Sequence, residues 1–81
     1  MTREVLWTRA VWELFEELPK PDQDAILDHL EYLPRFPHMY PVRIKGRFRR
    51  HRWFQAGNWL VYYRVVDRTV YIREIWPARI P

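Results

Sequence analysis

Residues 59–76 decide the fold, and they read WLVYYRVVDRTVYIREIW. Aromatic and β-branched residues dominate both halves of this stretch, and such residues are enriched in β-strands. Asp67 and Arg68 interrupt the pattern at its centre, where a tight turn is expected. The stretch therefore predicts two strands, 59–66 and 69–76, that pair as an antiparallel hairpin.

A third strand is expected immediately upstream of this hairpin. Residues 47–55 are rich in aromatic side chains, and the tripeptide Ala56-Gly57-Asn58 separates them from the next strand. Gly57 or Asn58 can adopt the positive φ that a tight hairpin turn requires. The C-terminal half is thus predicted to be a three-stranded β-meander.

Two amphipathic helices are expected in the N-terminal part, after a short strand over residues 4–8. Thr8 stands where a helix N-cap should be, and Pro19 and Pro21 separate the two helices. Pro34 stops the second helix, and the short turn between the helices predicts a helical hairpin. The apolar faces comprise Ala10, Val11, Leu14, Phe15 and Leu18 in the first helix and Ile26, Leu27, Leu30 and Leu33 in the second.

The predicted fold class is α+β with the element order β-α-α-β-β-β. We expect an antiparallel sheet with the N-terminal helical hairpin packed on one face, and the other face left open. A length of 81 residues fits one domain, 1–81. The chain has no cysteine and only scattered histidines, and no apolar run reaches the length of a membrane span. A cytoplasmic protein without metal, cofactor or membrane partner is therefore expected.

Charge is divided unevenly along the chain. Residues 1–32 carry three Lys/Arg against eight Asp/Glu, a net charge of −5, whereas residues 33–81 carry eleven against two, a net charge of +9. No acidic residue occurs between Glu31 and Asp67. This split predicts one negative and one positive side of the molecule, and a positive side favours polyanionic partners.

Strand alternation assigns side chains to the two faces of the predicted sheet. Charged pairs such as Arg64 and Arg73 should avoid a thin apolar core. The same alternation turns Glu74 and Trp76 inward, where Glu74 needs an arginine partner or a place beyond the helices. We therefore expect Val61, Tyr63, Val65, Val70 and Ile72 under the helices, and Tyr62, Arg64, Tyr71, Arg73 and Ile75 on the open face.

The first strand of the meander is the hardest to register. Phe48 and Phe54 are predicted core anchors, so alternate positions should line the open face. Arg50 and Arg52 then share the inner parity, and a β-bulge or an edge position would bring them out to solvent. This register adds Arg49, His51 and Trp53 to the open face.

A face that mixes basic and aromatic side chains is typical of proteins that bind single-stranded nucleic acid. Lysine and arginine neutralise phosphates, and aromatic rings stack on exposed bases. The alternative is a solvated basic sheet whose aromatic residues only pack against their cross-strand neighbours. The predicted RNA-binding residues are Lys45, Arg47, Arg49, Trp53, Tyr62 and Tyr71.

The same face could cleave RNA without a metal. Attack by the 2′-hydroxyl needs a base, an acid and cations near the scissile phosphate. His51 has the side chain best suited to proton transfer near neutral pH, and its alternative is an ordinary surface histidine. Arg64, Arg73 and Arg79 would stabilise the developing negative charge. These four residues are the predicted catalytic set of an endoribonuclease.

Three segments resemble the RelE/ParE superfamily of toxins from type II toxin–antitoxin systems. They are VRIKG at 42–46, AGNWLVYYRVVD at 56–67 and VYIREIWPARIP at 70–81, and the element order agrees. The resemblance implies a cognate antitoxin partner that wraps the toxin. RelE-like members cut mRNA in the ribosomal A site with basic and sometimes His, Glu or Tyr residues, whereas ParE-like members poison DNA gyrase.

The chain departs from the RelE-like pattern at several positions. Leu60 stands where an arginine is expected, and Trp76-Pro77 occupies the region of a C-terminal Tyr or His. The lysines of the first meander strand are replaced by Arg49, His51 and Trp53. The prediction is a toxin that cleaves mRNA on the ribosome and inhibits translation. The alternatives are a gyrase poison and a toxin-fold protein that only binds its antitoxin.

Overall fold

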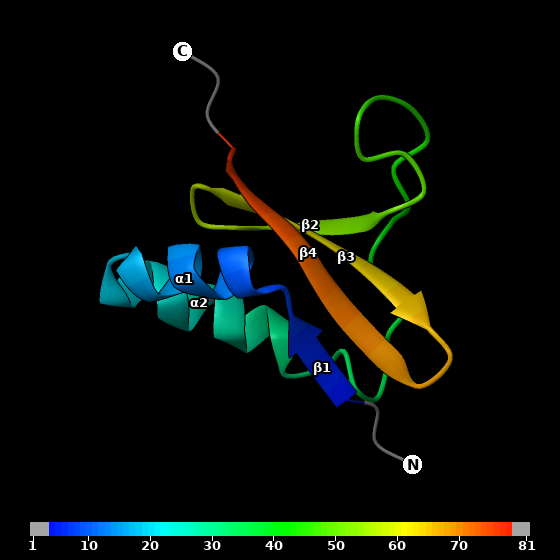
Figure 1. The fold of residues 1–81 in the computed structure, drawn as a ribbon, viewed down its shortest axis with the longest axis horizontal. Helices are drawn as coiled ribbons and strands as arrows, with labels where there is room; N and C mark the ends of the chain where they lie inside the picture. Colours follow the sequence, from blue (N-terminus) through cyan, green and yellow to red (C-terminus); the bar gives the residue numbers. More distant parts are fainter. Residues whose placement is uncertain (1–3, 79–81) are drawn as a thin grey trace.

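A four-stranded sheet with two helices on one side forms the protein (Figure 1). The computed structural model describes residues 4–78. The elements are β1 (Glu4–Trp7), α1 (Arg9–Glu17), α2 (Lys20–Leu30), β2 (Arg52–Ala56), β3 (Trp59–Val66) and β4 (Thr69–Pro77). The expected α+β class and element order are confirmed.

The sheet is mixed rather than wholly antiparallel. Its strand order is β1-β4-β3-β2, in which β2, β3 and β4 form the expected antiparallel meander. β1 lies parallel to β4, with Val5 opposite Val70 and Trp7 opposite Ile72. Residues 8–68 connect β1 to β4 and include the helical hairpin and the other two strands; a connection this long allows parallel pairing, and a two-residue turn does not. The prediction of an antiparallel sheet was therefore wrong for β1 alone.

Local signals in the sequence form the helical hairpin. The Val11 amide donates to Oγ1 of Thr8 at 3.3 Å, which confirms Thr8 as an N-cap. The Gln23 side chain in α2 donates to the Phe15 carbonyl at 2.9 Å and to the Glu16 carbonyl at 3.2 Å. Because the end of α1 leaves carbonyls unpaired, this amide joins the two helices. Within residues 4–78, no helix is long and apolar enough to cross a membrane.

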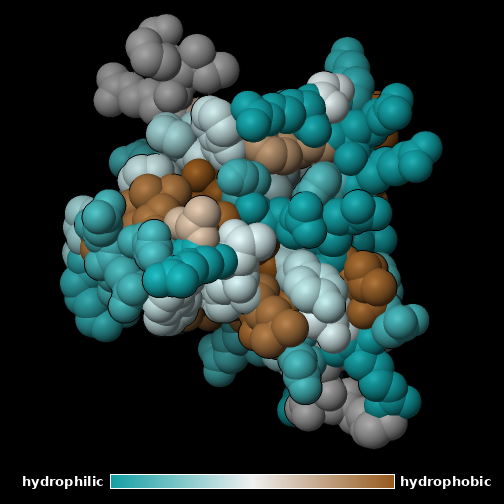
Figure 2. All heavy atoms as spheres, viewed as in Figure 1, coloured by the Kyte–Doolittle hydropathy of each residue, from teal (hydrophilic) through white to brown (hydrophobic). Residues whose placement is uncertain are grey.

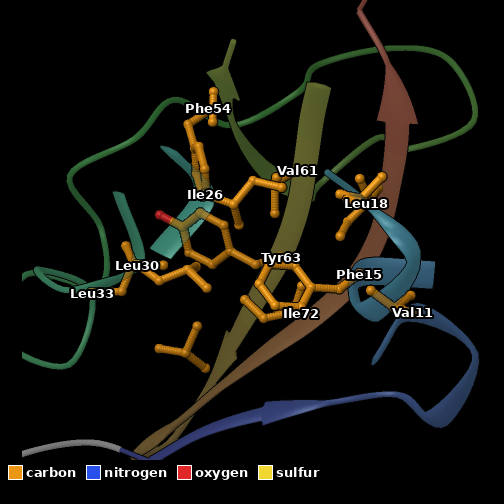
Figure 3. Close-up of a cluster of buried hydrophobic side chains, with 13 residues drawn as sticks. Val11, Phe15, Leu18, Ile26, Leu30, Leu33, Phe54, Val61, Tyr63 and Ile72 are labelled. Carbon is orange, nitrogen blue, oxygen red and sulfur yellow. The ribbon is translucent and has the colours of Figure 1, made fainter. Parts of the chain in front are cut away.

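The core fills the space between the helical hairpin and the sheet (Figure 3). Val61, Tyr63, Val70 and Ile72 are fully buried, as strand alternation predicts. Leu33 is also fully buried, although it follows α2 in a turn. Leu27 is exposed, so its assignment to the apolar stripe was wrong. The helices contribute Val11, Phe15, Leu18, Ile26 and Leu30 to this core.

Two side chains of the sheet anchor the long connector between α2 and β2. The hydroxyl of Tyr63 donates to the Pro37 carbonyl at 2.8 Å. Nη1 of Arg52 donates to the Tyr40 carbonyl at 2.7 Å and to the His38 carbonyl at 3.2 Å. A connector that lacks regular structure needs such partners for its backbone. Arg52 is thus a structural residue at the sheet edge rather than a free cation.

Residues 42–51 form a loop, not the first half of a strand. We call this segment the basic loop; it precedes β2, which begins only at Arg52. The Arg43 amide donates to the His51 carbonyl at 2.7 Å, and the Arg50 amide donates to the Arg43 carbonyl at 2.8 Å. Gly46 at φ 91° and Arg50 at φ 74° turn the chain inside it. The predicted strand over 47–55 was therefore too long.

A β-bulge in β4 changes the register of the open face. Tyr62 lies opposite Glu74 whereas Tyr63 lies opposite Ile72, so Arg73 is the extra residue. Beyond it, Ile75 pairs with Val61 and is buried in the core. The predictions that Ile75 faces solvent and that Glu74 and Trp76 turn inward were wrong, because the bulge reverses the alternation. Of the two alternatives expected for Arg50 and Arg52, the edge position is the one observed, because β2 is an edge strand; the bulge lies in β4 instead.

Tyr63→Phe should lower the free energy of unfolding by about 1–3 kcal/mol, because the buried Pro37 carbonyl loses its hydrogen-bond donor. Urea denaturation followed by circular dichroism measures the difference. Tyr71→Phe is the matched control, since it removes the same hydroxyl from a half-exposed position. Equal stability of Tyr63→Phe and wild type would contradict the anchoring role.

The stability of the wild type should also fall at alkaline pH. Burial raises the pKa of Tyr63 from 10.0 to about 12. The unfolded chain releases this proton first, so stability is complete below pH 10.0 and is lost as the pH rises toward 12. The fall in the denaturation midpoint across this window should be shallower in Tyr63→Phe. Parallel pH profiles would contradict the prediction.

Ile75→Ala should lower the free energy of unfolding by about 2–4 kcal/mol, because the bulge places this side chain in the core. Glu74→Ala, one residue earlier on the open face, should cost less than about 0.5 kcal/mol. Thermal and urea denaturation of both variants test the register. A larger loss for Glu74→Ala than for Ile75→Ala would overturn it.

Candidate nucleic-acid interface

The open face of the sheet is organised in three cross-strand rows. Each row takes residues that lie opposite one another in neighbouring strands. The first row runs along the hairpin end, the second crosses the bulge, and the third reaches β1. The rows are Gln55–Leu60–Trp76, Trp53–Tyr62–Glu74 and Arg64–Tyr71–Leu6.

The basic loop rises beside this face, away from the helices (Figure 1). Its cationic side chains are all exposed, and Figure 2 shows a largely hydrophilic surface over this part of the molecule. Because the chain turns within the loop, its cationic side chains lie close together; in an extended strand they would alternate between the two faces of the sheet. These side chains are Arg43, Lys45, Arg47, Arg49 and Arg50.

His51 lies at the junction of the basic loop and β2. Its ring meets Phe48 edge-on, with centroids 5.9 Å apart, and its Nδ1 lies 3.3 Å from the Arg49 carbonyl oxygen. A carbonyl oxygen only accepts, so in this contact Nδ1 is the donor. Arg52 pairs with Tyr63 in the antiparallel ladder, so His51, one residue before Arg52, lies level with Arg64, one residue after Tyr63. His51 is therefore beside the sheet, but not in the strand where the sequence placed it.

Arg64, Arg73 and Glu74 bring opposite charges to the sheet itself. Arg64 lies opposite Tyr71 and is exposed, as predicted. Arg73 is exposed at the bulge, and Glu74 follows it opposite Tyr62. Both guanidinium groups can meet phosphates, while the Glu74 carboxylate can accept a proton. The open face thus combines cations with two groups capable of proton transfer, His51 and Glu74.

Tyr62 does not present its ring to solvent. The Phe48 ring stacks on it at 4.1 Å between centroids and 21° between planes, and the tyrosine is 3% exposed. The prediction of Phe48 as a core anchor was wrong, since this ring packs on the opposite side of the sheet from Phe54. A stacking surface for a ligand would therefore be Phe48 and Trp76 rather than Tyr62.

The other predicted site residues divide between the sheet and the loop. Trp53 and Tyr71 lie half-buried on the open face. Lys45 lies in the basic loop near Trp53, in a hollow of about 260 Å³, and Arg47 lies over the Phe48 and Trp76 rings. Arg49 belongs to the loop and not to β2. Arg79 lies outside the described residues.

Sequence reasoning missed Arg43, Phe48 and Glu74 as residues of this face. Glu74 was misplaced because the bulge is invisible to a strict two-residue period. Phe48 was assigned to the core on its apolar character alone. Gly46 was the available signal, because a glycine before the aromatic and basic run is typical of a turn that bends the chain.

Comparison with known proteins agrees with this architecture. A family model described as the ParE toxin of the type II toxin–antitoxin system parDE matches residues 5–80. A search of curated proteins found no match. The fold and the match over nearly the whole chain define a toxin of the RelE/ParE superfamily. The chain belongs to the ParE toxin family of type II toxin–antitoxin systems.

Solved structures from toxin–antitoxin complexes share the fold at low sequence identity. A chain of the archaeal RelE–RelB complex from Pyrococcus horikoshii OT3 superposes with a TM-score of 0.77 and 21% identity, covering 96% of this chain and 97% of that one. The RelBE2 complex of Mycobacterium tuberculosis gives 0.77 and 19%, covering 98% and 95%. The chromosomal ParDE system of P. aeruginosa gives 0.63 and 15%, covering 96% and 98%.

Proposed function

We propose that this toxin is a ribosome-dependent mRNA endoribonuclease that inhibits translation in the cytoplasm. The single observation that carries the proposal is the open face, which combines Arg64, Arg73 and Glu74 on the sheet with His51 and the cations of the basic loop beside it. A protein that only displayed positive charge would not need proton-transfer groups beside those cations. This combination supports cleavage of a bound RNA.

The chemistry is transfer of the phosphoryl group within the RNA. A base removes the proton from a 2′-hydroxyl, and the 2′-oxygen forms a bond to the adjacent phosphorus. The bond from phosphorus to the 5′-oxygen breaks, and that oxygen receives a proton from an acid. The products are a 2′,3′-cyclic phosphate and a 5′-hydroxyl end. No metal, reductant or cofactor enters this balance.

We assign roles to side chains from their positions on the face. Glu74 or the Nε2 nitrogen of His51 removes the 2′-hydroxyl proton, and the other member of the pair protonates the leaving oxygen. Arg64 and Arg73 stabilise the charge that develops on the phosphate oxygens. Arg79 keeps its predicted role as a further cation. With both residues the site contains a base and an acid, which the reaction needs and which His51 alone would have to supply.

A reconstituted translation reaction tests the proposal. Wild-type toxin should cleave ribosome-bound mRNA, and His51→Ala, Glu74→Gln and Arg64→Ala should each slow cleavage by about 100-fold or more. Primer extension maps the cuts, and end analysis identifies the cyclic phosphate. Arg9→Ala is the matched control because it removes an exposed arginine from the helical side. Intact mRNA with folded wild-type toxin would reject the endoribonuclease.

The second candidate is a DNA gyrase poison. The match to the ParE family model favours it. A supercoiling assay with purified gyrase separates the two functions, because an RNase leaves supercoiling unaffected. Inhibition of supercoiling together with intact mRNA would establish the gyrase function. The third alternative, a toxin-fold protein that only binds an antitoxin, requires both assays to be negative.

A cognate antitoxin is the proposed protein partner. Its binding segment should be acidic or apolar, because such a segment would cover the basic face and exclude RNA from it. The complexes that contain the structural neighbours support this partner. A small acidic protein encoded beside the toxin gene is the first candidate to isolate.

The affinity for the antitoxin should fall as salt is added, because screening weakens contacts between exposed charges. Isothermal titration at 0.05 and 0.5 M salt measures the change (about a tenfold difference in ionic strength). Arg64→Ala should reduce this salt dependence, whereas Arg9→Ala should not. An affinity that is independent of salt would exclude an electrostatic cover of the open face.

A further inference from the structure

A groove lies between the basic loop and the end of β4. Its volume is about 290 Å³, and residues from the basic loop, β3 and the end of β4 line it. It continues the first cross-strand row of the open face, in which Leu60 lies opposite Trp76. Its lining consists of Arg43, Arg47, Phe48, Leu60, Tyr62, Trp76, Pro77 and Ala78.

The groove has aromatic walls that are already in contact with a flat cation. The Phe48 and Trp76 rings lie 6.0 Å apart between centroids, at 61° between planes. The guanidinium carbon of Arg47 lies 5.7 Å from the Phe48 centroid and 5.5 Å from the Trp76 centroid. A planar group can therefore lie face-on to one ring with its edge toward the other, and the position of Phe48 is fixed by its stack on Tyr62.

The charge around these rings selects an anionic ligand. Arg43 and Arg47 are exposed at the groove, and none of the lining residues within 4–78 is acidic. A ligand with a flat aromatic ring and a phosphate could stack its ring on the aromatic walls and pair its phosphate with the arginines. That chemistry is a nucleotide: the base would take the guanidinium's place over the rings, and Arg47 would then meet the phosphate.

We propose that this groove binds one unstacked nucleotide of a single-stranded RNA, with the base against Trp76 and Phe48 and the phosphate on Arg43 and Arg47. A base inside a duplex cannot reach the rings because its faces are covered by its neighbours. The row containing Leu60 and Trp76 adjoins the row containing Glu74. The groove therefore holds a nucleotide beside the one to be cleaved, and the choice of RNA rests on the proposed function.

Equilibrium binding without ribosomes tests the groove. A short single-stranded RNA that contains the fluorescent base 2-aminopurine reports stacking by quenching, and a labelled copy reports affinity by anisotropy. Wild type should bind the RNA and quench the probe. Trp76→Ala should weaken binding by about 5- to 150-fold and abolish the quenching, and Trp76→Phe should restore much of both.

Trp12→Ala provides the matched control on the helical side. Trp12 is 42% exposed and Trp76 is 40% exposed, so each variant removes a similarly exposed indole. The control should bind and quench as wild type does. Arg43→Gln gives a second variant at an exposed position; it should weaken binding and leave the quenching of the bound probe unchanged. Circular dichroism confirms that each variant is folded.

The outcomes separate this inference from the proposed function. Unchanged affinity and quenching in folded Trp76→Ala would overturn the groove, as would unchanged affinity in Arg43→Gln if Trp76→Ala does not fold. Equal binding of duplex RNA would also overturn it, and so would saturation by a free mononucleotide at the same concentration as the oligonucleotide. Stacking without mRNA cleavage in translation would keep the groove and reject the endoribonuclease. Cleavage of mRNA without stacking of the probe would keep the endoribonuclease and reject the groove.

Discussion

The hydroxyl of Tyr63 fixes the part of the chain that has no regular structure. The ring is buried beneath the helical hairpin, and its hydrogen bond reaches the Pro37 carbonyl in the connector. Arg52 adds bonds to the next turns of the same connector. Both residues lie in the sheet, opposite each other in β2 and β3. The basic loop therefore starts from a segment tied to the core, and this tie determines where its cations meet the open face.

The meander could be predicted from the sequence because aromatic and β-branched runs alternate with turn residues. Gly57 adopts the expected positive φ, and the expected tight turn after β3 has a positive φ at Asp67. Most helix ends were equally predictable, since Thr8 caps α1 and prolines separate the two helices, but α2 ends at Leu30, before the stop expected at Pro34. The parallel pairing of β1 was not predictable from local signals, because its partner β4 is the last element of the chain. Pairing between distant segments depends on the whole fold.

The candidate site was predicted in composition more closely than in position. Arg64, Trp53 and Tyr71 follow the two-residue period and lie on the open face. Glu74 breaks it because Arg73 is an extra residue between the partners of Tyr62 and Tyr63, and no residue type in the sequence indicates such a bulge. Phe48 could not be placed by period either, because it lies in a loop whose direction changes at Gly46 and Arg50. Its packing partner, Tyr62, is a residue that alternation does place on that face.

The unequal division of charge has a consequence for motion before contact. Helices of net negative charge on one side and a cationic loop and sheet on the other give the molecule a large electric dipole. In the field of a phosphate-rich particle, a dipole experiences a torque as well as an attraction. The torque would turn the open face toward the particle and the helical hairpin away from it, so a larger fraction of collisions would occur in the productive orientation. Charge of one sign spread evenly over the surface would attract the same particle without this selection of orientation.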